Sequence, residues 1–470
     1  MLRRTTVLAL IALVFVMVSP VWGGGSASTR AAASTGFRDL KGLHVINGSW
    51  NTDYNVLTAT PPTSELGLKI YNWRLQVFRE HNFTMEDKRI AANNGESLQL
   101  MISSIMAGDP AATTFTQLPD QVISLMGQGL IFPITDNRVV NLRNPQPVRE
   151  GVRAVEWSQT TLDAFALDGK SYAYSLGTSV SNVDLIFFNK RHFIEAGVDP
   201  DLPYNMQRDG TWTWDNFLDL CRRLTRDINN DGIIDRYAFT RGNATLLTSA
   251  IVTSNGAQLL DRDPRTGRFI NSTNTPAFIE ALQFIQRLQA AGVMSERPTG
   301  VPWDWERTAF MNGELTMLFA ESYFQGTFTS MADDWGIVLA PRGPRSNSVR
   351  VPLRDGPRMV PVTFNLDQVD DIMYALALYN TPQDQPDDWR IASYPTYRDF
   401  RAVDETINLI RNRPDLHLYK YWSMAEATLP MGDIIDRIWE VGANPATIVE
   451  SASPRYNGAI DDLNRALGLR

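Results

Sequence analysis

The segment at residues 227–235 (DINNDGIID) carries oxygen-bearing groups at alternate positions, as a calcium-binding loop does. Four side chains and one backbone carbonyl supply these oxygens, and they belong to Asp227, Asn229, Asp231, Ile233 and Asp235. Gly232 allows the sharp turn that such a loop needs. The position where a bidentate glutamate would close the ligand shell holds Ala238, so we expect weak binding. The spacing predicts a structural calcium ion, and an Asx-rich turn between a helix and a strand is the alternative.

The sequence lacks the residue patterns of the common catalytic centres. Its four histidines do not have a zinc-binding spacing, and there is no G-x-S-x-G, no Walker A loop and no G-x-G-x-x-G after a strand. The single cysteine, Cys221, excludes an intrachain disulfide framework and a cysteine-cluster zinc site. We therefore expect no enzymatic activity and no required cofactor. A glycosidase needs only two facing carboxylates, so a secreted carbohydrate-active enzyme is the alternative.

Length and charge restrict the class of protein further. The chain has 470 residues, 43% of them hydrophobic and 20% charged, which is enough apolar side chain for a folded protein of two large domains. Its 44 Lys and Arg residues face 52 Asp and Glu residues, and the net charge is −8. An acidic chain without a basic block argues against a nucleic-acid partner.

The first 27 residues have the three parts of a secretory signal peptide. Arg3 and Arg4 precede an apolar run at residues 7–18, and small residues follow at 23–27. The run is short for a membrane-spanning helix, although an uncleaved anchor is the alternative. No cysteine follows the run, which excludes the bacterial lipoprotein route. Residues 28–36 predict a flexible leader, and the protein is expected in the periplasm or the cell-surface space.

The rest of the chain alternates helices with short apolar strands. Residues 66–81 and 277–291 have apolar side chains at helical spacing. Short apolar runs at 43–46, 172–176 and 183–188 predict strands. This alternation predicts an α/β fold with mainly parallel sheets.

Five short segments follow one another in an order typical of one protein family. D-G-K-S-Y-A-Y at residues 168–174 and L-I-F-F-N-K at 185–190 match a pair of crossover strands, and T-W-D-N-F at 213–217 matches a helix start. F-M-N-G-E-L-T-M at 310–317 and W-G-I-V-L-A-P at 335–341 complete the series. The chain thereby resembles the family 1 extracellular solute-binding proteins, the maltose-binding-protein-like receptors of carbohydrate ABC importers.

The resemblance implies a fold of the periplasmic-binding-protein type, with two lobes and a ligand cleft between them. It also implies a monomer that binds a sugar or oligosaccharide and delivers it to permease subunits in the membrane. A polyol or a glycerophosphodiester is an alternative solute. The lobes and crossings would lie at residues 37–176 plus 341–400 for lobe 1, 177–340 plus 401–470 for lobe 2, and 176–181 and 339–343 for the crossings.

The candidate ligand-binding residues are chosen for the chemistry of a sugar, whose apolar face stacks on aromatic rings and whose hydroxyls need polar partners. Trp50 and Asp53 follow the first predicted strand, and α/β sheets bind ligands at the carboxyl ends of their strands. Tyr323 stands where the family usually has a stacking tryptophan. The full predicted set is Trp50, Asp53, Asn255, Trp303, Trp305, Tyr323 and Arg342. Packing within the protein is the alternative role for each of them.

Overall fold

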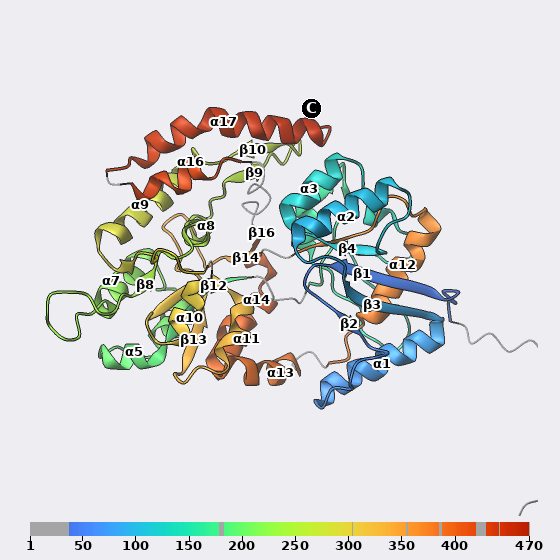
Figure 1. The fold of residues 1–470 in the computed structure, drawn as a ribbon, viewed down its shortest axis with the longest axis horizontal. Helices are drawn as coiled ribbons and strands as arrows, with labels where there is room; N and C mark the ends of the chain where they lie inside the picture. Colours follow the sequence, from blue (N-terminus) through green and yellow to red (C-terminus); the bar gives the residue numbers. More distant parts are fainter. Residues whose placement is uncertain are drawn as a thin grey trace, which may run out of the picture. The chain divides into compact units, whose positions relative to one another are not determined.

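Short strands and helices alternate along the chain, as the sequence predicts (Figure 1). The computed structural model describes residues 37–177, 183–302, 304–353, 356–384, 388–419, 429–440 and 442–469. Asp39–Arg470 form one unit, and only Phe37 and Arg38 are described of the other unit, Met1–Arg38. The predicted signal peptide and leader lie outside the described residues. Within the described ranges, no helix has the length and apolar character needed to span a membrane.

The first sheet has five strands in the order β15-β4-β1-β3-β2. Their bounds are β1 (Leu43–Ser49), β2 (Tyr54–Asn55), β3 (Phe83–Arg89), β4 (Thr114–Thr116) and β15 (Arg358–Met359). The central strand β1 is parallel to both β3 and β4, whereas the edge strands β2 and β15 are antiparallel to their neighbours. Asn47 of β1 pairs with Asp87 of β3 and Thr114 of β4, so the side chains of these three residues share one face.

Two helices cover that face of the first sheet, α1 (Glu65–His81) and α12 (Leu366–Tyr379). The amino-terminal half of the face is apolar, and its buried Val45 and Met85 pack with Trp73 of α1 and Met373 of α12. The Trp73 indole nitrogen donates a hydrogen bond to the Leu378 carbonyl at 2.8 Å, which joins the two helices. Helix α2 (Asn94–Met106) also contacts β1, and α3 (Pro119–Gly127) follows β4 along the chain.

The second sheet has β7 (Asp184–Asn189) between β12 (Met317–Glu321) and β13 (Trp335–Val338). Every residue of β7 is buried, and β7 runs antiparallel to both neighbours. The sequence predicts mainly parallel sheets, and for this sheet the prediction is wrong. A fully buried apolar run does not reveal the direction of its neighbours, because it suits a central strand of a parallel or an antiparallel sheet. Beside it, β8 (Phe239–Thr240) pairs in parallel with β11 (Met294–Ser295) and contacts β12.

We call the second sheet and the elements around it the second half. Its helices include α5 (Lys190–Glu195), α6 (Leu202–Arg208), α7 (Trp214–Leu224), α8 (Ala244–Ser254), α9 (Pro276–Ala290) and α10 (Trp305–Met311). The Thr213 side chain caps α7, as the sequence predicts. Further elements are α4 (Gln159–Ala164), β5 (Ala166–Leu167), β6 (Lys170–Ser171), β9 (Leu260–Arg262), β10 (Phe269–Asn271), α11 (Gln325–Phe328), α14 (Asn408–Asn412), α16 (Gly432–Ile435) and α17 (Pro445–Ala466).

Residues 339–343, where the sequence predicts a crossing, stay bonded to the second half. The Trp212 indole donates to the Leu339 carbonyl at 2.7 Å, and the Gly343 amide donates to the Ser254 carbonyl at 2.9 Å. A Cβ added at Gly343 would lie 2.3 Å from Asn255 Oδ1, so glycine is required for this approach. The chain then forms β14 (Val351–Leu353), which pairs in parallel with β16 (His417–Tyr419), before it reaches β15 in the first sheet.

The segment around residue 400 also contacts the second sheet. It comprises α13 (Asp388–Tyr397) and a π-helix at Ala402–Ile407. The Thr406 hydroxyl donates to the Ile337 carbonyl of β13 at 2.7 Å. Residues 388–400, which are predicted to belong to lobe 1, also contact this half: the Tyr397 ring packs on Trp335 of β13, and Arg398 pairs with Asp334. The lobe boundaries stay a prediction.

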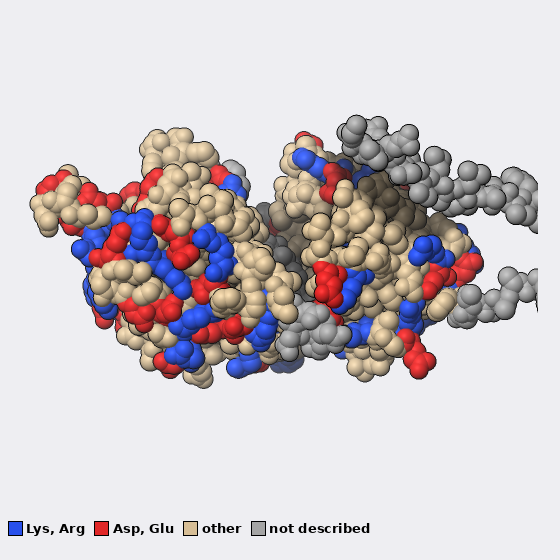
Figure 2. All heavy atoms as spheres, turned by 90° about the horizontal axis from the view of Figure 1, so that it is seen from below, with Lys and Arg blue, Asp and Glu red and all other residues tan. Residues whose placement is uncertain are grey.

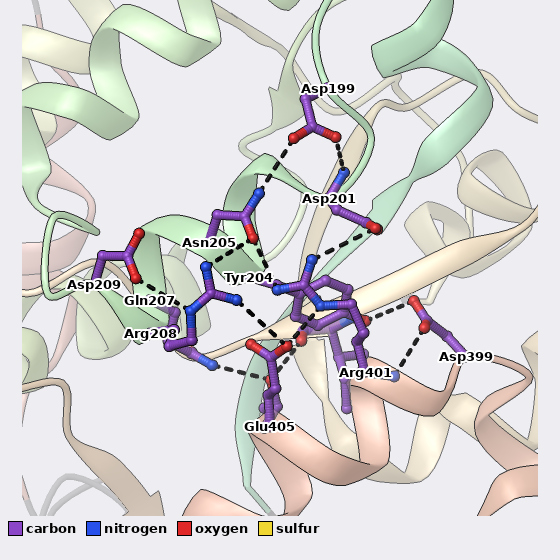
Figure 3. Close-up of polar contacts among 12 residues, drawn as sticks. Asp199, Asp201, Tyr204, Asn205, Gln207, Arg208, Asp209, Asp399, Arg401 and Glu405 are labelled. Atoms are coloured by element: carbon purple, nitrogen blue, oxygen red, sulfur yellow. Dashed lines mark hydrogen bonds and ion pairs between the residues drawn. The ribbon is translucent and has the colours of Figure 1, made fainter.

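A buried tyrosine connects this segment to β13 and α6 (Figure 3). The Tyr204 hydroxyl donates to Asp399 Oδ2 at 2.9 Å and accepts from the Ile337 amide at 3.1 Å. Lys190 Nζ lies 2.7 Å from both Asp201 and Asp399. Burial raises the pKa of Tyr204 well above its ordinary value, so the phenol stays protonated and can donate.

We predict that Tyr204→Phe lowers the free energy of unfolding by about 1–3 kcal/mol, because a buried amide and a carboxylate each lose a partner. Tyr394→Phe is the matched control, since it removes a hydrogen bond of 2.8 Å to Asp404 at an exposed site. It should lower the free energy of unfolding much less than Tyr204→Phe does. Chemical denaturation measures both, and equal losses would contradict the structural role of Tyr204.

Candidate functional site

The carboxyl ends of the parallel strands β1, β3 and β4 meet at one edge of the first sheet. Trp50 follows β1 directly and is half-buried. Asp53 is exposed, and its Oδ1 accepts a hydrogen bond of 2.7 Å from the Arg89 amide at the end of β3. Both predicted residues therefore lie at the edge where α/β sheets bind ligands.

A polar cluster that sequence reasoning missed lies next to this edge; we call Asn47, Asp87, Thr114, Tyr174 and Arg358 the first-sheet cluster. The Asn47 amide donates to Asp87 Oδ1 at 2.6 Å, and the Thr114 hydroxyl donates to Asn47 Oδ1 at 3.0 Å. An Arg358 guanidinium nitrogen lies 3.5 Å from the same Asp87 oxygen. The backbones of Tyr174 and Arg358 exchange hydrogen bonds of 2.8 and 2.9 Å. Charged and polar side chains thus replace apolar ones as the sheet approaches its carboxyl edge.

The second half has a comparable edge beyond β8, β11 and β12. Tyr323 follows β12, is 43% exposed and contacts the Phe324 ring edge-on at 4.9 Å. Arg241 follows β8, pairs with Glu296 and places its guanidinium 5.2 Å from the Trp439 ring. An exposed aromatic ring and a paired arginine are therefore available at this edge.

The start of α10 supplies further polar groups. Trp305 is half-buried and packs against the core, and the predicted Trp303 lies outside the described residues. Asp304 pairs with Arg307. Glu306 is 4% exposed, and in the described part of the chain its Oε2 has no hydrogen-bond partner. Burial raises the pKa of the Glu306 carboxyl.

The side-chain amide of Asn255 makes its hydrogen bonds within the protein. Its Nδ2 donates to the Ala277 carbonyl at 2.8 Å, its Oδ1 accepts from the Arg345 amide at 2.9 Å, and the residue is 1% exposed. Arg342 is half-buried, and its guanidinium donates to the carbonyls of Gly210 at 3.3 Å and Ser346 at 3.2 Å. These contacts give both predicted residues a structural role, and a role in ligand binding stays a prediction for each of them.

The loop at residues 227–235 uses its carboxylates as acceptors for its own backbone. Asp227 Oδ2 accepts from the Gly232 amide and Asp231 Oδ1 from the Ile233 amide, both at 2.8 Å. Asp235 Oδ2 accepts from two backbone amides at 2.6 and 3.2 Å. Among the residues that the structure describes, no group of three or more His, Cys, Asp or Glu side chains is placed to hold a metal ion. Calcium binding here stays a prediction from the sequence.

Residues 90–356, more than half of the chain, match the family model of the bacterial extracellular solute-binding proteins. The chain belongs to this family. The family resemblance that the sequence motifs predict is thus confirmed, and with it an extracytoplasmic protein. No curated protein sequence matches this solute-binding protein.

Solved structures confirm the two-lobed α/β fold. The cyclic alpha-maltosyl-1,6-maltose binding protein from Arthrobacter globiformis has a TM-score of 0.60 and 16% identity, over 90% of this chain and 100% of its own. UgpB from Mycobacterium tuberculosis, in complex with glycerophosphocholine, has a TM-score of 0.58 and 14% identity, over 90% of this chain and 98% of its own. An ABC substrate-binding protein from Listeria monocytogenes, in complex with cycloalternan, has a TM-score of 0.54 and 14% identity, over 91% of this chain and 100% of its own.

We predict that Glu306→Gln raises the melting temperature of this solute-binding protein at neutral pH. The raised pKa means that the folded state binds a proton where the unfolded state has released it, so stability falls as the pH rises through that range. The gain should shrink as the pH falls towards the ordinary carboxyl pKa. Glu450→Gln, at an exposed position of α17, is the control. A gain from Glu306→Gln that is equal at acidic and neutral pH would contradict the account.

The calcium hypothesis predicts that added calcium raises the melting temperature of chelator-treated protein by mass action. Asp231→Ala should remove that rise, because it deletes a central oxygen ligand. Melting curves that coincide in chelator and in excess calcium would identify the loop as a self-contained Asx turn.

Proposed function

We propose that this solute-binding protein binds a sugar or oligosaccharide outside the cytoplasmic membrane and delivers it to the permease of an ABC importer. Support comes from the family match and from the structural neighbours, which are a cyclic alpha-maltosyl-1,6-maltose binding protein and two proteins in complex with cycloalternan and glycerophosphocholine. The observation that carries the proposal is the pair of accessible aromatic rings, Trp50 one residue after β1 and Tyr323 two residues after β12, each at a carboxyl edge.

The two edges offer partners for both the apolar C–H face and the hydroxyl groups of a sugar. Exposed rings can cover the apolar C–H face, and stacking removes apolar area from water. Asp53 and the polar groups around Glu306 can accept hydrogen bonds from the sugar hydroxyls. In our proposal the first edge belongs to lobe 1 and the second to lobe 2, and the lobes close on the solute.

The cellular setting follows from the same proposal. An N-terminal signal peptide at residues 1–27 would export the chain, and a monomer would meet the permease in the membrane. On the face drawn in Figure 2, Lys and Arg lie interspersed with Asp and Glu rather than gathered in one basic patch of the kind that binds nucleic acid.

Binding without turnover separates this function from a carbohydrate-active enzyme. A thermal-shift screen against neutral sugars and polyols should find a ligand that raises the melting temperature, because only the folded state binds it. The same ligand, incubated with the protein, should be recovered intact. Hydrolysis of the ligand would contradict the proposal and favour the enzyme.

We predict that Trp50→Ala and Tyr323→Ala each weaken binding of the identified ligand about ten- to a hundredfold. Loss of an aromatic stacking surface costs roughly 1.5–3 kcal/mol, and 1.4 kcal/mol is about tenfold in affinity. Since neither ring is fully buried, stability should fall much less than the 3–5 kcal/mol typical of a core aromatic. Titration calorimetry and thermal melting measure the two effects.

Phe400→Ala is the matched control, because Phe400 is 68% exposed and contacts the ring of Tyr394 rather than either edge. It should leave the affinity unchanged. Early unfolding with intact affinity in the Trp50 and Tyr323 variants would show that both rings serve packing.

A further inference from the structure

Arg74 places a positive charge beside the first-sheet cluster, and no carboxylate among the described residues pairs with it. Its guanidinium carbon lies 3.9 Å from the centre of the Tyr379 ring and 5.8 Å from that of Tyr54. Its Nε is buried, and among the described residues no group accepts a hydrogen bond from it. The described part of the chain also gives the Arg74 guanidinium no ion pair, so its only close partners are aromatic rings.

The surrounding groups belong to one electrostatic neighbourhood. Tyr54 of β2, over whose ring Arg74 lies, is paired with Asp87 of β3, which Arg358 faces at 3.5 Å, so both guanidinium groups lie at the same part of the sheet. Burial raises the pKa of Tyr379 to about 12 and that of Tyr174 to about 12. Both phenols are therefore neutral at physiological pH, and neither compensates a positive charge.

Positive charges outnumber negative ones among the described residues of this neighbourhood, because Arg74 and Arg358 face Asp87 alone. Asp87 is its one carboxylate among the described residues, and Asp87 Oδ1 already accepts from Asn47 and faces Arg358. Of the two guanidinium groups, only that of Arg358 is paired with this carboxylate among the described residues. A neutral sugar hydroxyl needs acceptors as well as donors, whereas an anionic oxygen group only accepts. Guanidinium groups also match the geometry of phosphate and carboxylate oxygens.

We infer that the solute carries an anionic oxygen group, a phosphate, phosphodiester or carboxylate, that Arg74 and Arg358 bind. This inference rests on the proposed function and names the chemical class of the solute. The neutral, sugar-like or polyol-like part of the molecule then contacts the aromatic rings at the sheet edges. Both arginines are half-buried, and the Arg358 side chain is 28% exposed.

The test compares each charged probe with its neutral parent by titration calorimetry. The probes are glucose 6-phosphate and glucuronate against glucose, and glycerol 3-phosphate against glycerol. At least one charged probe should bind about tenfold more tightly than its parent, and its affinity should fall as the salt concentration rises. Phosphate probes and glucuronate separate a phosphate group from a carboxylate.

Variants connect the preference to the two arginines. Arg74→Met and Arg358→Met should each remove most of the preference, while Arg74→Lys keeps the charge and should keep part of it. Arg79→Met is the matched control, since Arg79 is exposed on the same helix. Thermal melting confirms that each variant is folded, and Arg358→Met keeps the test open where Arg74→Met does not fold.

The outcomes separate this inference from the proposed function. A neutral parent that binds as tightly as its charged form, or a preference that survives in both arginine-to-methionine variants, overturns the anionic group and leaves the solute-binding function intact. Failure of every charged probe and of inorganic phosphate to bind overturns it too. If neutral sugars and polyols also fail to bind, the proposed function falls with it.

Discussion

The parallel register of β1 with β3 and β4 is the constraint on which the first candidate edge depends. It aligns Asn47 with Asp87 and with Thr114, residues that are far apart in sequence, and gives all three the same face. The amino-terminal half of that face is sealed by the apolar contacts of α1 and α12, and polar side chains gather at the other half. The carboxyl edge is thus the place where polar groups and an aromatic ring can meet a solute without opening the core.

The second half depends on a different constraint, which is a close backbone approach at Gly343. Because no Cβ fits beside Asn255 and Trp214, the chain leaving β13 is fixed against α7 and α8 before it continues to β14. The Tyr204 hydrogen bonds fix the segment near residue 400 on the same sheet (Figure 3). Asn255 and Arg342, two of the predicted ligand contacts, also hold this scaffold together through their hydrogen bonds.

Sequence reasoning predicted the features that depend on local pattern. The α1 helix and the buried strand β7 follow from periodicity and from apolar runs, and Trp50 and Asp53 follow from their position after a strand. The antiparallel direction of β7 could not be predicted, because burial on both faces is common to either direction. Asp87 and Arg358 were missed because their contact joins residues 271 positions apart, and only the sheet register brings them together.

A receptor that binds its solute between two lobes should close when the solute binds. Small-angle X-ray scattering of the full chain, measured alone and with a ligand shown by calorimetry to saturate it, tests this closure. The account predicts a smaller radius of gyration with ligand, because binding should favour the closed arrangement. Scattering curves that coincide at saturation would contradict it.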